Sequence, residues 1–423
     1  MSIAANQQRT FLRLIAQLRP HWHRDAALPA RIHSLLAANR AFGSRDRRMY
    51  RELIYTTLRY SPWIEPLLDG QPEEAVRRIA WLAADLPATK AFRATFATGE
   101  TPAGDKAELL PAWFRTHCPE IFSGAELEAQ LRRAPLWLRL QTAEPGERRL
   151  FDEFETHGWP WTRSTILPEA IELLAETDVT KTGAWRDGRI EVQDLGSQLV
   201  LASIGIEPGG NWLDACAGAG GKTLQLARLL GPAGQVDAYD IRPGALAELQ
   251  ARAARAGVAC HRIDEAAASA PAGAPTPLAH RPTAGSANNA WASIRIIAHV
   301  PAGVYDGVLV DAPCSGSGTW RRAPHLKWVT TEARIAQAAE KQRALLHQFS
   351  RHVRPGGRLV YATCSLSRRE NEEVVMTFLA EHPDFQAMPF ANSFGARPRE
   401  IGLTILPATH DTDGFFVASL GRR

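Results

Sequence analysis

Cysteine is scarce in this chain and follows no recognisable pattern. The 423 residues include five cysteines, at positions 118, 216, 260, 314 and 364. Their number is odd, they lie far apart, and they include no Cys-x-x-Cys pair. This spacing argues against a disulfide framework and against a cysteine-based zinc site. We therefore expect a cytoplasmic protein that works without a metal.

Long apolar runs are also missing. No window approaches the roughly eighteen apolar residues of a membrane span, and residues 1–20 contain three arginines but no continuous apolar core of a signal peptide. Hydrophobic residues nevertheless make up 45% of the chain, so we expect a globular protein of two or three domains without a membrane segment.

Acidic residues are rare at one end. Residues 1–60 hold eleven arginines against three acids, a net charge of +8, whereas the whole chain carries +4. A basic end on a nearly neutral chain favours a polyanionic partner such as RNA. An ordinary solvated basic face is the competing interpretation.

The pattern of residues predicts three parts. Residues 1–133 read as an all-helical bundle, because apolar residues recur at helical spacing between prolines. Residues 134–190 read as a small mixed α/β subdomain, of the type that leads nucleic acid into a site. From 191 to 423, strands alternate with helices, which predicts a doubly wound, Rossmann-like α/β sheet. An Ala- and Pro-rich tract at about 265–295 reads as a flexible insertion in this third part.

Glycines cluster between a predicted strand at 211–216 and a predicted helix at 224–230. Such a turn lets the backbone approach a ligand and presents the first amides of a helix. A P-loop would need glycine where Cys216 stands, and a dinucleotide fingerprint would need glycine at Thr223. S-adenosylmethionine needs no phosphate cradle, but it needs an acid after the next strand, and Asp240 meets that spacing. Asp264 follows the strand predicted at 258–263 and is expected on the adenine side.

A second polar cluster follows an apolar run at 308–310. Asp311 ends the predicted strand, and Cys314 comes three residues later. Another predicted strand, 358–363, ends at Cys364. Ligands of open α/β sheets bind at the carboxyl ends of strands, so these side chains are placed for chemistry. Beyond Cys314, cationic residues alternate with tryptophans, which suits RNA; the residues expected to bind it are Arg321, Arg322 and Lys327.

Two cysteines with a methyl donor suit one reaction, the methylation of carbon 5 of a pyrimidine. A thiolate that adds at carbon 6 turns the ring into a nucleophile at carbon 5. An acid must hold the ring nitrogen, for which Asp311 is placed. A further group must help to remove the carbon 5 proton and release the enzyme, for which Cys314 is a candidate.

Taken in order, these motifs resemble the RNA 5-methylcytosine methyltransferase family of the RsmB/NSUN type. The resemblance covers roughly residues 134–423, and its matching pieces are Gln193-Asp194, Ser197-Gln198, Asp214, Cys216-Ala217, Gly220-Gly221-Lys222-Thr223, Asp240, Asp264, Asp311-Ala312-Pro313-Cys314-Ser315-Gly316, Tyr361, Thr363-Cys364-Ser365, Glu370-Asn371-Glu372 and Asp413-Gly414-Phe415-Phe416. More weakly, the N-terminal segment resembles the NusB-like helical domain of the bacterial 16S ribosomal members. One departure is Ala219, which replaces the proline usual in the family turn and is expected to loosen it.

The resemblance implies that Cys364 is the nucleophile and that Cys314 assists release, with S-adenosylmethionine as cofactor. The residues expected to hold or surround the cofactor are Cys216, Ala217, Gly218, Ala219, Gly220, Gly221, Lys222, Asp240, Asp264 and Asp311. We expect a monomer that acts on small-subunit ribosomal RNA. The alternatives are a transfer RNA methyltransferase with the same chemistry, a non-catalytic ribosome-assembly factor, and a small-molecule methyltransferase.

Overall fold

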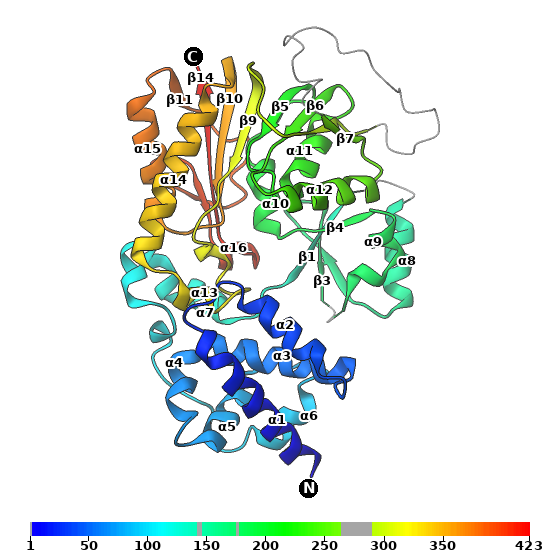
Figure 1. Cartoon of the computed structure of the whole chain (residues 1–423), viewed down its shortest axis with the longest axis vertical. Helices are drawn as coiled ribbons and strands as arrows, with labels where there is room; N and C mark the ends of the chain where they lie inside the picture. The colour runs from blue at the N-terminus through cyan, green and yellow to red at the C-terminus, as the bar shows by residue number, and fades with distance from the viewer. Residues whose placement is uncertain (1, 142–145, 175–176, 264–289) are drawn as a thin grey trace. The chain divides into compact units, whose positions relative to one another are not determined.

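The computed structural model describes residues 2–141, 146–174, 177–263 and 290–423. The chain divides into two compact units, Met1–Ala134 with Gly316–Arg334, and Pro135–Ser315 with Ile335–Arg423. The first unit is helical and the second contains two sheets (Figure 1). The sequence assigned residues 316–334 to the catalytic domain, whereas the structure groups them with the helical unit.

The helical unit forms because its longer helices are amphipathic. In α1 (Ile3–Leu18), Phe11, Leu14, Ile15 and Leu18 recur at helical spacing and are all buried. They pack in one cluster with apolar residues of the other long helices, α2 (Leu28–Ala38), α3 (Ser44–Arg59) and α5 (Pro72–Leu82). The shorter helices of the unit are α4 (Ser61–Ile64), α6 (Lys90–Phe96), α7 (Gly124–Leu131) and α13 (Leu326–Val329). The prediction of a helical N-terminal region is confirmed.

The smaller sheet of the second unit has the order β2-β3-β1-β4, and all its neighbours are antiparallel. Its strands are β1 (Leu136–Leu140), β2 (Trp161–Arg163), β3 (Ala170–Leu173) and β4 (Ile190–Val192). Leu138 and Ile171 pack against Leu150 and Phe154 of α8 (Gly146–Thr156). The short helix α9 (Gly183–Arg186) precedes β4.

The larger sheet carries the motifs singled out in the sequence. Its parallel part has the order β10-β9-β5-β6-β8-β7, built from β5 (Gly210–Asp214), β6 (Gly234–Ala238), β7 (Cys260–Ile263), β8 (Ser293–Ile297), β9 (Tyr305–Asp311) and β10 (Val353–Thr363). The antiparallel β14 (Phe415–Arg422) follows β10, and it pairs with β11 (Phe385–Ala387) and β13 (Leu403–Ile405). The edge strand β12 (Arg397–Pro398) pairs with β13, and α16 (Pro407–His410) precedes β14.

Helices cover both faces of this sheet, because its strands are apolar on both sides. Leu309 packs in the cluster with α10 (Leu195–Ala202), α11 (Gly221–Leu230) and α12 (Pro243–Arg255), whereas Val308 and Val310 pack with α14 (Glu332–Ser350) and α15 (Glu372–Glu381). Figure 1 shows α14 and α15 beside β10 and β14. The alternation follows from the two-residue period of a strand. The Rossmann-like fold class is confirmed.

The sequence interpretation missed strand β8. It assigned residues up to about 295 to the Ala- and Pro-rich insertion, whereas Ser293–Ile297 forms a strand between β6 and β7. The alternating Ile-Arg-Ile pattern is a strand signal, but it follows directly on the low-complexity tract. Strand β7 is consequently at the edge of the sheet rather than next to β6. Asp264 and residues 265–289 lie outside the described residues.

Candidate active site

Two cysteines meet at the carboxyl edge of the larger sheet. β9 ends at Asp311 and Cys314 follows, while β10 ends at Thr363 directly before Cys364. The two strands are parallel neighbours with Asp311 opposite Ala362, so their carboxyl ends lie side by side. The Sγ atoms of Cys314 and Cys364 are 3.3 Å apart, and both residues are half-buried and not joined by a disulfide. The sequence placed both cysteines at strand ends, and the structure brings them together.

The loop that carries Cys364 is held by its own polar neighbours. Thr363 Oγ1 donates to Asn371 Oδ1 at 2.6 Å, and Asn371 Nδ2 donates to the Ser365 carbonyl at 2.9 Å. Glu370, in the turn before α15, points inward and is fully buried. Glu370 therefore lies outside α15, whose first-turn acids are Glu372 and Glu373.

The turn after β5 requires glycine at two positions. Gly218 has φ +54° and Gly220 has φ +87°, in the region that L side chains avoid. A Cβ atom on Gly220 would also lie 2.2 Å from Leu249 Cδ1 on α12. Helix α11 begins directly afterwards at Gly221, and the first N–H groups of a helix have no partner within it. The turn thus combines close backbone approach with amide donors.

Asp240 lies just after β6 and is tied to this turn. Its Oδ2 accepts a hydrogen bond from the Gly218 N–H at 2.9 Å. Arg242 binds the same carboxylate with Nε at 2.9 Å and Nη2 at 3.0 Å. Burial alone would raise the pKa of Asp240, but the hydrogen bonds from Arg242 and Gly218 outweigh burial and lower it. The carboxylate therefore stays ionised as a hydrogen-bond acceptor.

Lys222 joins the glycine-rich turn to the end of β9. Its Nζ lies 2.8 Å from Asp311 Oδ2, and the lysine side chain is 8% exposed whereas that of Asp311 is 31% exposed. The same ammonium group lies 5.2 Å from the centre of the Phe415 ring. Asp311 is thus the solvent-accessible member of the pair and remains able to accept a further hydrogen bond.

Two side chains at the end of β5, Asp214 and Cys216, have raised pKa values. Burial raises the pKa of Asp214 to about 7, against a hydrogen bond from Thr223 Oγ1 at 2.7 Å. Burial also raises the pKa of the Cys216 thiol, and Asp214 and Asp311 raise it further. A thiol in this environment stays protonated, which disfavours Cys216 as a nucleophile.

Two arginines far from the turn in sequence hold its backbone. Arg252 on α12 donates to the Ala219 carbonyl at 2.8 Å, and Arg139 on β1 donates to the Gly221 carbonyl at 3.4 Å. Glu191 on β4 binds Arg252 at 3.0 Å and Arg255 at 3.2 Å. The smaller sheet is therefore bonded to the turn. The sequence interpretation missed this support, because neither arginine belongs to a local motif.

Two motifs that are 219 residues apart in the sequence also meet. Asp194, the N-cap of α10, accepts from the Gly196 N–H at 2.8 Å and from the Asp413 N–H at 3.2 Å. Thr412 Oγ1 donates to the same carboxylate. The Asp194 carboxylate thus has a structural role, because its hydrogen bonds hold the residues before β14 against the start of α10.

The prediction that Arg321 and Lys327 bind RNA is contradicted by their burial. Both side chains are at most 1% exposed. Lys327 Nζ donates to the carbonyls of Arg59 and Leu109 at 2.8 and 2.9 Å, and Arg321 donates to the Arg133 carbonyl at 3.1 Å. Burial, and then Arg59, lower the pKa of Lys327 well below its ordinary value. These two cations satisfy backbone carbonyls inside the helical unit, whereas Arg322 is exposed.

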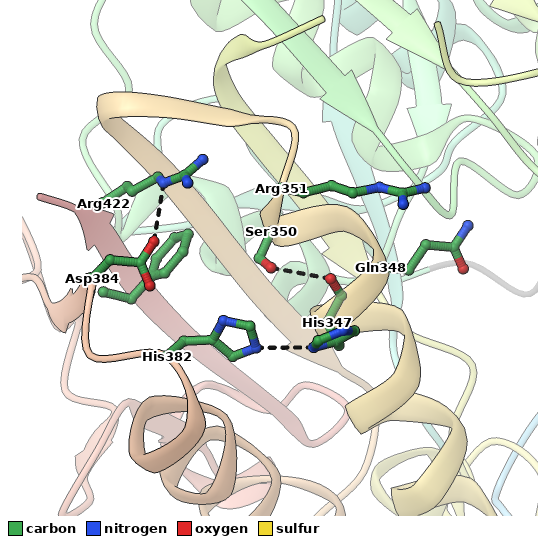
Figure 2. Close-up of a pocket in the computed structure, with 8 residues that line it drawn as sticks. His347, Gln348, Ser350, Arg351, His382, Asp384 and Arg422 are labelled. Carbon is green, nitrogen blue, oxygen red and sulfur yellow. Dashed lines mark hydrogen bonds and ion pairs between the residues drawn. The ribbon is translucent and has the colours of Figure 1, made fainter. Parts of the chain in front are cut away.

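A hollow on the second unit lies away from the cysteines. Figure 2 shows the hydrogen bond between the rings of His347 and His382, whose nitrogens are 3.0 Å apart, and the pair of Asp384 with Arg422, at 3.1 Å. This hollow adjoins the amino end of β10, whereas Cys364 follows its carboxyl end, roughly 30 Å along the strand. It is not part of the candidate active site.

Within the described ranges, no three His, Cys, Asp or Glu side chains are grouped so that they could hold a metal ion. Every helix in the part of the chain that the structure describes is too short or too polar to cross a membrane. The donor set at the carboxyl edge, a glycine turn followed by an ionised acid after the next strand, fits a nucleoside cofactor.

Comparisons with known proteins agree with this arrangement. Residues 202–421 match a family model described as 16S rRNA methyltransferase RsmB/F. A Synechocystis protein named probable ribosomal RNA small subunit methyltransferase B is 34% identical over 320 residues, 74% of this chain and 66% of that protein. A Bacillus subtilis protein of the same name is 30% identical over 293 residues, 68% of this chain and 59% of that protein. The chain thus covers less than two thirds of these relatives.

Solved structures share the fold. The crystal structure of PH0851 matches with a TM-score of 0.71 at 22% identity, over 99% of both chains. The crystal structure of NSun6 from Pyrococcus horikoshii with SFG matches with a TM-score of 0.59 at 17% identity, over 76% of this chain and 98% of that chain. At these identities the similarity concerns the fold.

Proposed function

Because the chain belongs to the RsmB/F family of 16S rRNA methyltransferases, we propose that it methylates carbon 5 of a cytosine in small-subunit ribosomal RNA. The observation that carries the proposal is the cysteine pair, with Cys314 Sγ and Cys364 Sγ 3.3 Å apart at the ends of adjacent strands. Methylation at an oxygen or at an amino nitrogen needs no cysteine nucleophile. Carbon 5 of a pyrimidine needs one, because the ring must first be activated.

Cys364 adds to carbon 6 of the target cytosine. The new S–C bond breaks the 5,6 double bond and shifts an electron pair to carbon 5, which takes the methyl group. Loss of the carbon 5 proton to a base then restores the double bond as the S–C bond breaks and Cys364 leaves as a thiolate. Cys314 stands beside the sulfur that must leave, and it assists this second stage. Asp311, partly exposed and oriented by Lys222, delivers a proton to ring nitrogen N3 as the thiolate adds and takes it back when Cys364 leaves.

S-adenosylmethionine supplies the methyl group as an electrophilic sulfonium. The residues of this chain that would hold it are the turn at 216–222 and Asp240, whose carboxylate accepts the ribose hydroxyls. The register of this acid, just after the strand next to β5, supports the assignment. For the adenine side we keep Asp264 as a prediction.

The substrate assignment rests on the relatives' names and on the basic helical unit. Arg45, Arg48 and Arg51 recur every three residues along α3 and are exposed, with Tyr55 in the next turn. Such a stripe of guanidinium groups suits the phosphates of a structured RNA. Together with exposed Arg322, it is the RNA contact that we propose.

The test uses the whole chain, labelled S-adenosylmethionine, and 16S ribosomal RNA, the small subunit or transfer RNA as acceptors. We expect label in 5-methylcytosine of small-subunit RNA. Cys364→Ala should abolish transfer, whereas Cys314→Ala should leave a protein–RNA adduct that survives denaturing electrophoresis. Cys260→Ala, on the edge strand β7, is the matched cysteine control and should retain transfer.

Label on transfer RNA alone would show that the substrate is transfer RNA, and the proposed cysteine mechanism would be unaffected. Full transfer by Cys364→Ala would refute the adduct. Absence of transfer to every RNA, with cofactor and RNA binding intact, would support a non-catalytic assembly factor instead.

A further inference from the structure

The loops that carry the two cysteines are joined by one buried carboxylate. We infer that Glu370 is a positioning residue that holds Cys314 and Cys364 in register, so that addition and release act on one base. The inference rests on the proposed function for its chemistry, but its geometry stands independently.

Glu370 binds both loops at the residue next to each cysteine. Its Oε2 accepts from Ser315 Oγ at 2.5 Å and from Ser365 Oγ at 2.6 Å. Its Oε1 accepts from the Ser315 N–H at 2.7 Å and from Gln342 Nε2 at 3.2 Å. Gln342 also donates to the Pro313 carbonyl at 3.0 Å. One side chain thus gathers four donors from the two loops and from α14.

The burial of Glu370 makes this network costly to disturb. The residue is 0% exposed, and no cation in the described chain forms an ion pair with it. A buried carboxylate without a cation is stable only where hydrogen bonds replace its lost hydration. The four donors do so, and in return the carboxylate fixes their positions. Loss of any one donor should therefore move the loop to which it belongs.

The two serines are not equivalent, which gives the inference a specific consequence. Ser365 reaches Glu370 through its hydroxyl alone, whereas Ser315 reaches it through both its hydroxyl and its backbone N–H. Ser365→Ala should displace Cys364 and slow addition to the base. Ser315→Ala should displace Cys314 and slow release. A residue that served only stability would slow both stages alike.

The first experiment measures the geometry without any methyl transfer. Diamide accepts two electrons and two protons from a pair of neighbouring thiols and leaves a disulfide. In the purified chain we expect rapid closure between Cys314 and Cys364, measured as the joined peptides by mass spectrometry. Closure in Glu370→Gln should be at least about tenfold slower, because each carboxylate oxygen accepts two hydrogen bonds and the variant replaces one of these oxygens by an amide nitrogen.

Asp237→Asn is the matched control. Asp237 is also a 0% exposed carboxylate, and it accepts hydrogen bonds from Arg295 and Tyr305 on the same sheet. Its loss should lower the melting temperature without changing the closure rate. Equal closure rates in the original chain and in Glu370→Gln would overturn the inference, whether or not the protein proves to be a methyltransferase.

The second experiment measures the two stages on RNA. Single turnovers should show about tenfold slower adduct formation in Ser365→Ala, and accumulation of adduct in Ser315→Ala. A proportional loss of both stages in both variants, following their melting temperatures as in Asp237→Asn, would overturn the positioning role. If the unmodified chain forms neither adduct nor product, the proposed function fails, and the diamide result still decides the role of Glu370.

Discussion

The carboxyl edge of the larger sheet has two halves that are held in different ways. At the ends of β5 and β6, two glycines with positive φ shape the turn, and the side chains of Arg252 and Arg139 bind its backbone carbonyls. At the ends of β9 and β10, the loops are held by side chains that converge on Glu370. The first half leaves amides and an acid for a ligand. The second half fixes two sulfur atoms.

The difference follows from what each half must do. A cofactor that is replaced in every turnover is bound best by backbone donors, which need no reorganisation. A covalent partner needs a single reactive atom in one position, and short hydrogen bonds to a buried carboxylate restrict that position. We therefore expect substitutions in one half to spare the function of the other. Two measurements separate them: the affinity for S-adenosylhomocysteine, and the rate of disulfide closure by diamide.

The largest effect is expected from Gly220→Ala. The new Cβ would lie 2.2 Å from Leu249 Cδ1, at a backbone φ of +87°. Strain and overpacking together should lower the unfolding free energy by about 2–4 kcal/mol and weaken cofactor binding by at least about 100-fold. Urea unfolding measures the loss of stability, and titration calorimetry measures the loss of cofactor affinity. Disulfide closure in the folded fraction should stay unchanged.

A double substitution separates the two causes of the Gly220→Ala effect, the collision with Leu249 and the positive φ. Leu249→Ala combined with Gly220→Ala removes the collision but leaves the unfavourable φ. Partial recovery of cofactor affinity is the expected result. Full recovery would mean that space alone explains the need for glycine, and would weaken the argument from backbone conformation.

Asp214 predicts how stability depends on pH. Its pKa is raised in the folded state, from 3.8 to about 7. The folded protein therefore holds this proton more tightly than the unfolded chain. The stabilisation is complete below about pH 4 and is lost as the pH rises through 7, by at most about 1.4 kcal/mol per pH unit.

Urea unfolding of Asp214→Asn between pH 4 and pH 8 tests this sign. The substituted protein should lose less stability than the original chain as the pH rises towards 7, and the two slopes should be equal above that. Equal slopes over the whole range would show that Asp214 titrates normally.

Arg252→Ala tests the support of the turn from outside. Loss of the hydrogen bond to the Ala219 carbonyl should weaken cofactor binding by about tenfold. Arg255→Ala is the matched control, because Arg255 binds the same Glu191 carboxylate but has no contact with the turn. If both substitutions weaken binding equally, the ion pair with Glu191 matters rather than the contact with Ala219.

Local signals in the sequence predicted the two halves but not what holds them. Gly218, Gly220, Asp240 and the two paired cysteines follow closely on apolar strands, so the sheet topology alone brings them to one edge. The partners of these residues are distant: Glu370 is 55 residues from Ser315, and Arg252 is 33 residues from Ala219. Such pairs are set by tertiary packing, which one sequence does not encode locally.

The wrong prediction for Arg321 and Lys327 has the same cause, since their partners are also distant in the sequence. Arg321 and Lys327 alternate with tryptophans as an RNA-binding loop would, yet their partners are backbone carbonyls of Arg133, Arg59 and Leu109. The separation is 188 residues or more in each pair. Residue type alone did not distinguish a cation that binds an RNA phosphate from one that binds a buried backbone carbonyl.

The smallest effect is expected at Arg242, which covers the proposed ribose acceptor. The Arg242 side chain is 68% exposed while it binds Asp240, whose side chain is only 5% exposed. A ribose would have to displace this arginine from the carboxylate. Because an exposed ion pair contributes less than about 1 kcal/mol, Arg242→Ala should tighten S-adenosylhomocysteine binding by no more than about fivefold. Arg354→Ala removes a comparable exposed pair with Asp306, at the start of β9, and should leave the affinity unchanged. Weaker binding in Arg242→Ala would mean that the arginine contacts the cofactor itself, and the cofactor half would then use a second side chain beside that of Asp240.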